Sequence, residues 1–125
     1  MSVTWKFALE EELVTAQAKG PTTYEQCISM LEEVSGDPRH DPRFKVLVDV
    51  RGIDYSPSVA EVRQLAEALV ERRESFSNGM AVIVDPGPHY DLAELCSRLA
   101  KSQGFTLACF GTEPLAVDWC SRNGD

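Results

Sequence analysis

The chain of 125 residues lacks the features that mark two large classes of protein. Its longest uninterrupted apolar run, Met80–Val84, is far shorter than the roughly 20 residues that cross a bilayer as a helix. Basic residues are scarce, with 12 Lys and Arg against 20 Asp and Glu and a net charge of −8. Arg72-Arg73 is the one adjacent basic pair, whereas a nucleic-acid-binding surface needs clustered Lys and Arg. The composition therefore predicts neither membrane insertion nor nucleic-acid binding.

The cysteines are few and widely separated, so they form no redox or metal-binding motif. No Cys-x-x-Cys pair occurs among Cys27, Cys96, Cys109 and Cys120. A chain of this length buries a core without disulfides, and no signal-peptide pattern precedes it. We expect at least three of the four thiols to be buried core groups, and we expect no cofactor and no metal. These observations predict a single domain over residues 1–125 of a soluble protein in the reduced cytoplasm.

The first twenty residues alternate between apolar and polar side chains. Val3, Trp5, Phe7 and Leu9 fall on one face, which is typical of a strand with one buried side. A short acidic turn and the half-buried stretch 13–18 follow. This pattern predicts an antiparallel hairpin.

The following segments alternate between helical periodicity and apolar runs. The spacing predicts helices around residues 24–34, 59–70, 92–99 and 115–120, with Val59 and Leu115 among the inward-facing positions. Either Thr22 with Glu25 or Thr23 with Gln26 forms a capping box before the first helix. Nearly continuous apolar runs at 44–50, 80–84 and 105–110 predict strands, of which the first two are covered on both faces.

The order of elements is therefore β-β-α-β-α-β-α-β-α. Strands that alternate with helices pair in parallel through right-handed crossovers. The sequence predicts an α/β fold with a mixed, mostly parallel, five-stranded sheet packed by helices.

The early hairpin and four further stretches of the chain resemble the SpoIIAA-like group, which is related to the STAS domain (sulfate transporter and anti-sigma factor antagonist). The four stretches are "VLVDVRGID", the following "YSPSVAEVRQLAE", "MAVIV" and the ending "ACFGTEPLAVDWC". The resemblance covers nearly the whole chain and implies a small fold of successive β-α units. It also implies a non-enzymatic regulatory or protein-interaction module whose partner the sequence does not name.

In anti-sigma factor antagonists, a serine at the start of the helix after this strand is phosphorylated to control partner binding. Ser58 is closest to that position, and Ser56 lies two residues earlier. The resemblance thus implies a phospho-site or binding site around Ser56–Ser58.

Physical chemistry gives the same two serines a simpler role. Ser58 with Glu61 fits a capping box, and Ser56 fits an N-cap followed by Pro57 at the first helical position. A helix N-terminus also attracts anions. Capping is the interpretation we favour for the serines.

Ligands of open α/β sheets bind beyond the carboxyl ends of the parallel strands. Three loops should meet there, and the polar rim that they supply is a candidate binding surface for a small anion or a protein. The candidate binding or phospho-site residues are Arg51, Tyr55, Ser56, Ser58, His89, Tyr90 and Thr112.

Other charged groups near this rim have local explanations. Asp49 and Arg51 are spaced to share one face of a strand, which predicts an ion pair. A triad of a serine with His89 and Asp85 lacks the Gly-x-Ser-x-Gly elbow that exposes a nucleophile. His40 should lie at the opposite end of the sheet, so the two histidines should not share a metal.

The sequence therefore favours a non-enzymatic interaction module with a polar rim. The alternative is a small-ligand or lipid carrier, which a deep apolar pocket would favour. A hydrolase is the third alternative, and it requires His89 within hydrogen-bonding reach of a serine oxygen. A free edge strand also makes a homodimer an expected assembly.

Overall fold

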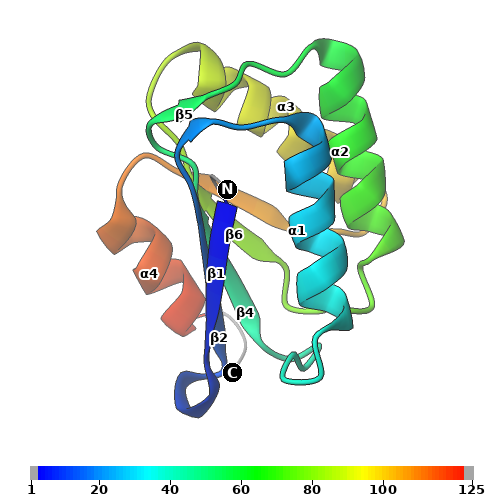
Figure 1. The fold of residues 1–125 in the computed structure, drawn as a ribbon, viewed down its shortest axis with the longest axis vertical. Coiled ribbons are helices and arrows are strands. Elements are labelled where there is room, and N and C mark those ends of the chain that lie inside the picture. Colours follow the sequence, from blue (N-terminus) through cyan, green and yellow to red (C-terminus); the bar gives the residue numbers. More distant parts are fainter. Residues whose placement is uncertain (1–2, 123–125) are drawn as a thin grey trace.

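The computed structural model describes residues 3–122 and contains the predicted five-stranded sheet (Figure 1). The strand order is β1-β2-β4-β6-β7, with β1 antiparallel to β2 and every other neighbouring pair parallel. The strands are β1 Val3–Ala8, β2 Leu13–Ala18, β4 Lys45–Asp49, β6 Met80–Ile83 and β7 Leu107–Phe110. The helices are α1 Tyr24–Gly36, α2 Val59–Glu71, α3 Pro88–Lys101 and α4 Glu113–Arg122. The predicted mixed α/β fold is confirmed.

A second, two-stranded ladder was not predicted from the sequence. β3 (Gly20–Pro21) pairs in parallel with β5 (Ile53–Asp54), and the Gly20 N–H donates to the Gly52 carbonyl over 3.0 Å. Strands of two residues carry no periodicity, so a pattern search cannot find them. The ladder fixes the loop after β4, which leads directly into the candidate site.

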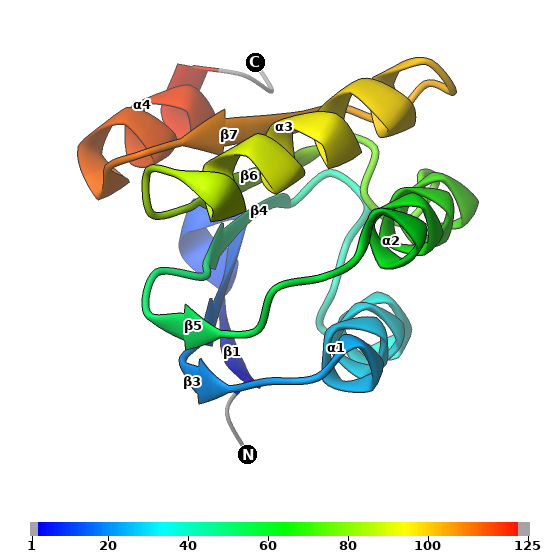
Figure 2. The same ribbon diagram turned by 90° about the horizontal axis from the view of Figure 1, so that it is seen from above.

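The helices divide unequally between the two faces of the sheet. α1, α2 and α3 cover one face, and α4 covers the other (Figure 2). Alternation along β4 separates the two sides, since Val46 and Val48 join the large core while Leu47 joins the small core under α4. The Lys45 ammonium also donates to the Cys120 carbonyl, which ties α4 to the start of β4.

Three predicted inward positions are wrong because each lies where an element begins or ends. Leu9 is 53% exposed, since the chain leaves β1 at Ala8 and turns through a 3-10 helix, Leu9–Glu11. Val59 and Leu115 are 54% and 58% exposed, because each lies in the first turn of its helix, beyond the edge of the core. Periodicity assigns a face to a residue but does not show how far the opposite layer extends.

Side-chain caps fix the starts of two helices. The Thr23 hydroxyl accepts from the Gln26 N–H and the Gln26 side chain accepts from the Thr23 N–H, which resolves the alternative left open before α1. Ser58 and Glu61 form the same reciprocal pair before α2. The predicted capping role of Ser58 is therefore confirmed.

The expectation of at least three buried cysteines is only partly correct. Cys96 and Cys120 are buried, whereas Cys27 and Cys109 are half-buried, and all four are free thiols. Within residues 3–122, no helix is long and apolar enough to span a bilayer.

Candidate functional site

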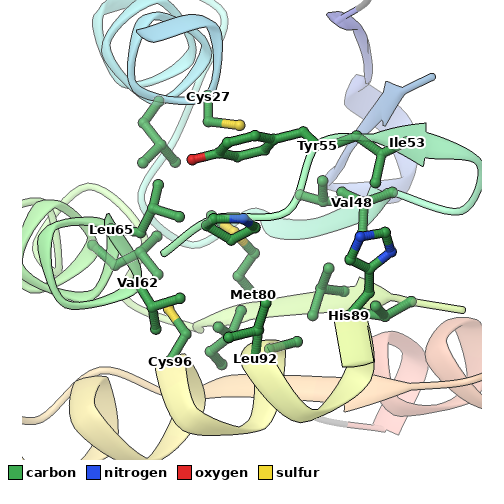
Figure 3. A pocket seen from close by; sticks show the side chains of 18 of the residues that line it. Cys27, Val48, Ile53, Tyr55, Val62, Leu65, Met80, His89, Leu92 and Cys96 are labelled. Atoms are coloured by element: carbon green, nitrogen blue, oxygen red, sulfur yellow. The ribbon is translucent and has the colours of Figure 1, made fainter. Parts of the chain in front are cut away.

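An apolar pocket lies between the sheet and the three helices α1, α2 and α3 (Figure 3). Its volume is about 190 Å³. In Figure 3, Tyr55 and Cys27 face Leu92 and Met80 across the pocket, and His89 lies at one end. Val50 and Val84 also line it, so the pocket reaches the carboxyl ends of β4 and β6. This is the end of a parallel sheet where ligands usually bind.

The sequence builds the walls of the pocket from ordinary core patterns. β4 and β6 supply alternate residues from the face that α1, α2 and α3 cover, and α2 and α3 supply positions at helical spacing. The contributions of these four elements are Val48, Met80, Val82, Val62, Leu65, Leu69, Leu92, Ala93 and Cys96. The short Ala93 side chain on α3 leaves space that a larger residue would fill.

Tyr55 forms a wall of the pocket and has a buried hydroxyl group. Among the described residues, no group is hydrogen-bonded to the Tyr55 Oη. Burial is the main cause that raises the pKa of Tyr55, and the neighbouring Glu61 carboxylate adds to the effect. The phenol is therefore neutral at physiological pH.

Two cysteines contribute thiols to the pocket. Burial raises the pKa of Cys27 to about 11 and that of Cys96 to about 12. Because the thiolate is the reactive form of cysteine, both side chains act as apolar wall groups at neutral pH. They give the pocket no nucleophile.

The structure brings three of the predicted rim residues, Tyr55, Ser56 and His89, together at the pocket. The Ser56 Oγ lies 3.0 Å from the His89 Nε2, and this hydrogen bond joins the loop before α2 to the first turn of α3. His89 lines the pocket, as do both neighbours of Ser56 in the chain, Tyr55 and Pro57. The pair therefore places two polar groups beside an apolar space.

The predicted location of His89 before the third helix is wrong. α3 begins at Pro88, which suits the first helical position because its missing N–H has no partner there in any helix. His89 consequently belongs to the first turn of α3. Asp85 does not complete a triad with it: among the described residues His89 bonds to Ser56 and not to Asp85, whose Oδ2 accepts from the Gly52 N–H over 2.9 Å.

The other predicted rim residues are held by local contacts. The Arg51 guanidinium forms the predicted ion pair with Asp49 at 2.8 Å, and its hydrogen bonds lower the pKa of that carboxyl group. The Tyr90 hydroxyl donates to the Cys109 carbonyl over 3.2 Å. Thr112 precedes α4, and its carbonyl accepts from the Ala116 N–H. None of these three residues lines the pocket.

His40 lies among aromatic rings, away from His89 and the pocket. Its ring packs against Phe76 at 5.0 Å between centroids, with Phe44 and Phe7 close by, and its Nε2 lies 2.6 Å from the Ser75 carbonyl oxygen. In the part of the chain that the structure describes, no three His, Cys, Asp or Glu side chains gather at a metal-binding distance.

Comparison with known proteins places the chain by its fold. No protein-family model matches the sequence, and no curated protein matches it. A solved structure is similar, that of an uncharacterised protein of the DUF3478 family with a SpoIIAA-like fold from Shewanella loihica PV-4. The TM-score is 0.61 over 94% of this chain and 91% of that chain, at 16% sequence identity. The chain thus has a SpoIIAA-like fold, as the sequence resemblance implied.

The pocket itself was not predicted from the sequence. Its lining residues have the same apolar types and spacing as a closed core, so nothing in the pattern separates the two. The available signals were indirect: the small Ala93 on the inner side of α3, and the proximity of a polar rim.

Proposed function

We propose that this protein is a non-enzymatic binding module of the SpoIIAA-like fold that holds a small amphiphilic molecule in the pocket between the sheet and α1, α2 and α3. The apolar pocket is the observation that carries the proposal. It is the feature that favours the carrier alternative over a binding surface restricted to the rim.

The volume of the pocket limits the size of the ligand. An apolar cavity of about 150 Å³ holds one benzene molecule, whereas drug-sized ligands occupy roughly 300 Å³ or more. A volume of about 190 Å³ therefore suits a single ring or a short alkyl chain. A full-length lipid chain would have to extend beyond the pocket.

The polar groups at one end of the pocket suggest where the polar part of a ligand would bind. Apart from the Tyr55 hydroxyl and the weakly hydrogen-bonding thiols of Cys27 and Cys96, the walls are hydrocarbon, and burying a polar group there without a partner costs free energy. Ser56 and His89 provide a hydroxyl group and an imidazole at one end. The apolar part of the ligand would occupy the pocket, and its polar end would contact this pair.

Binding of an anion or a partner at the rest of the rim has less support. Arg51 is already paired with Asp49, and Ser58 caps α2. A ligand at either residue would have to replace an existing contact. A regulatory role for Ser56–Ser58 remains a proposal that the pocket does not require.

The direct test is a titration with 1-hexanol and hexanoate, followed by methyl NMR of the valine and leucine side chains. We expect saturable shifts for Val48, Val82 and Leu65, which belong to three different walls. Ala93→Leu is the matched variant, because it fills the pocket while keeping a good helix former on α3. Shifts that stay linear with concentration, or that survive Ala93→Leu, would contradict the proposal.

Ester hydrolysis is a second candidate, favoured by the 3.0 Å contact between Ser56 Oγ and His89 Nε2. The serine oxygen would attack the carbonyl carbon of an apolar ester, and His89 would take its proton and pass it to the leaving alcohol. Water would then release the acid from the acyl-serine. Hydrolysis of 4-nitrophenyl butyrate at equal rates by the wild type and Ser56→Ala would eliminate this candidate.

A further inference from the structure

The two edges of the five-stranded sheet differ in how their backbone groups are satisfied. At the β7 edge, the Thr106 and Phe110 carbonyls accept hydrogen bonds from the N–H groups of Met80 and Val84, which lie on the β6 side. Because backbone groups alternate in direction along a strand, the carbonyls of Leu107 and Cys109 point outward, away from the sheet. Side chains of α3 satisfy both of these outward carbonyls. The Ser97 hydroxyl donates to the Leu107 carbonyl over 2.6 Å, and the Tyr90 hydroxyl donates to that of Cys109. Such covering prevents another strand from adding to an edge.

Among residues 3–122, no side chain covers the β1 edge in this way. Within residues 3–122, β1 pairs only with β2. The Lys45 N–H donates to the Glu12 carbonyl, so even-numbered residues of β2 face β4 and odd-numbered residues face β1. Through the register of the hairpin, Thr4, Lys6 and Ala8 then face β2. The N–H and C=O groups of residues 3, 5 and 7 point away from the sheet.

A groove of about 200 Å³ runs beside this edge, between β1 and α1. Figure 2 shows β1 and α1 on the same side of the molecule. Val3 and Trp5 form the apolar floor of the groove, while Glu25 and Glu33 line it from α1 and are exposed. An open strand edge thus lies next to an apolar strip bordered by two carboxylates.

We propose that the β1 edge is a protein-binding site that takes an extended segment with alternating apolar and basic residues. The segment would add as a strand beside β1, where the backbone groups of residues 3, 5 and 7 supply the hydrogen bonds. Its apolar side chains would cover Trp5, and its Lys or Arg side chains would meet Glu25 and Glu33.

The charges on α1 argue for a foreign segment rather than a second copy of this chain. Pairing of two β1 strands would place two α1 helices side by side, with Glu25 and Glu33 of each close to those of the other. Like charges in such an interface are unfavourable, and the net charge of −8 adds to the repulsion. A basic segment has the complementary charge.

The test uses a synthetic probe, an acetylated hexapeptide of alternating lysine and valine, titrated into the full chain at low salt. We expect saturable backbone amide shifts at Val3, Trp5 and Phe7. The double variant Glu25→Lys, Glu33→Lys should weaken binding by roughly tenfold, since two attractive exposed pairs become repulsive ones. Glu94→Lys, beside the covered β7 edge, is the matched control and should leave the affinity within about twofold.

A second probe separates strand addition from simple charge attraction. The same peptide with alternate backbone nitrogens methylated keeps its charges but cannot form a ladder, and it should lose the shifts at β1. Equal binding of the methylated peptide or of a glutamate–valine peptide would overturn the proposal. A concentration-dependent dimer in analytical ultracentrifugation, lost in Trp5→Pro, would overturn it in favour of self-association. Ala93→Leu should change none of these results, which separates this site from the pocket.

Discussion

The two faces of the sheet use the same strands but pack differently. On the α4 face, Leu47, Ala81 and Ile83 lie against Ala116 and Cys120 in a small buried cluster, with Phe110 and Trp119 in contact at its margin. On the opposite face, alternate residues of the same strands border the pocket under α1, α2 and α3. One helix thus closes a small surface, while three helices leave space over a larger one.

The difference lies in the size and position of side chains on the covering helices. α4 presents Ala116, which is completely buried, so its backbone approaches β4 and β6 closely. α2 and α3 line the pocket with bulky residues such as Leu65 and Leu92 together with the small Ala93. Small residues in a single interface allow contact, whereas one small residue among large ones leaves a cavity.

The largest expected effect is the removal of a closed-face side chain. Ile83→Ala should lower the free energy of unfolding by about 2–5 kcal/mol, because it opens a cavity in a packed cluster. Val82→Ala, on the pocket side of the same strand, should cost only about 1–2 kcal/mol, because Val82 is half-buried beside an existing space. Urea unfolding measures both, and equal costs would remove the distinction between the faces.

The converse change enlarges an alanine on each face. Ala116→Leu should destabilise the protein by about 1–3 kcal/mol, since the closed cluster has no room for the added atoms. Ala93→Leu should change stability by less than about 1 kcal/mol, because the pocket beside Ala93 has room for the added atoms. Thermal unfolding of the two variants gives the comparison, and a larger loss for Ala93→Leu would contradict it.

A smaller effect is expected at the cap that begins α2, one of the pocket walls. Ser58→Ala should cost about 1 kcal/mol, because it leaves the Glu61 N–H without its partner. Hexanol binding should be unchanged at a temperature where the variant is folded. Ser56→Ala tests the other serine: Ser56 caps no helix, so the change should cost less than about 0.5 kcal/mol of stability, but it removes the hydroxyl group beside the pocket and should weaken hexanol binding. A loss of binding in Ser58→Ala would assign Ser58 a role beyond capping.

The smallest effect concerns the ion pair at the end of β4. Arg51 lowers the pKa of Asp49 in the folded protein. The pair therefore stabilises the fold fully at pH values above about 3.9, the pKa of an aspartate in the unfolded chain. That contribution is lost as the pH falls through the lower, folded pKa. Arg51→Gln should therefore cost less than about 1 kcal/mol at pH 7. Urea unfolding at a series of decreasing pH values should show this difference disappearing as Asp49 becomes protonated in the folded protein, and a constant difference would exclude the ion pair as its cause.

Local patterns predicted the elements and several of their boundaries correctly. The alternation of Val3, Trp5 and Phe7 placed β1, and the serine and glutamate at 58 and 61 placed the start of α2. The spacing of Asp49 and Arg51 predicted their ion pair. These features depend on contacts within a few residues, which a sequence displays directly.

Contacts between distant segments were beyond the reach of the same patterns. The pairing of β3 with β5 and the hydrogen bond between Ser56 and His89 each join residues about thirty positions apart. The exposure of Val59 and Leu115 depends on where the neighbouring layers end. Periodicity contains no information on any of these distances.

The sequence by itself determined the order of strands and helices, the apolar face of each, and the cap at Ser58, because local backbone and side-chain chemistry decides these features. Only the tertiary structure decided that α2 and α3 leave a pocket beside β4 and β6 and that Ser56 meets His89 next to it. It also decided that, within residues 3–122, the β7 edge is covered while the β1 edge is open. The physical reason is that a core and a cavity use the same apolar residues, and the packing of distant elements alone determines which one they form.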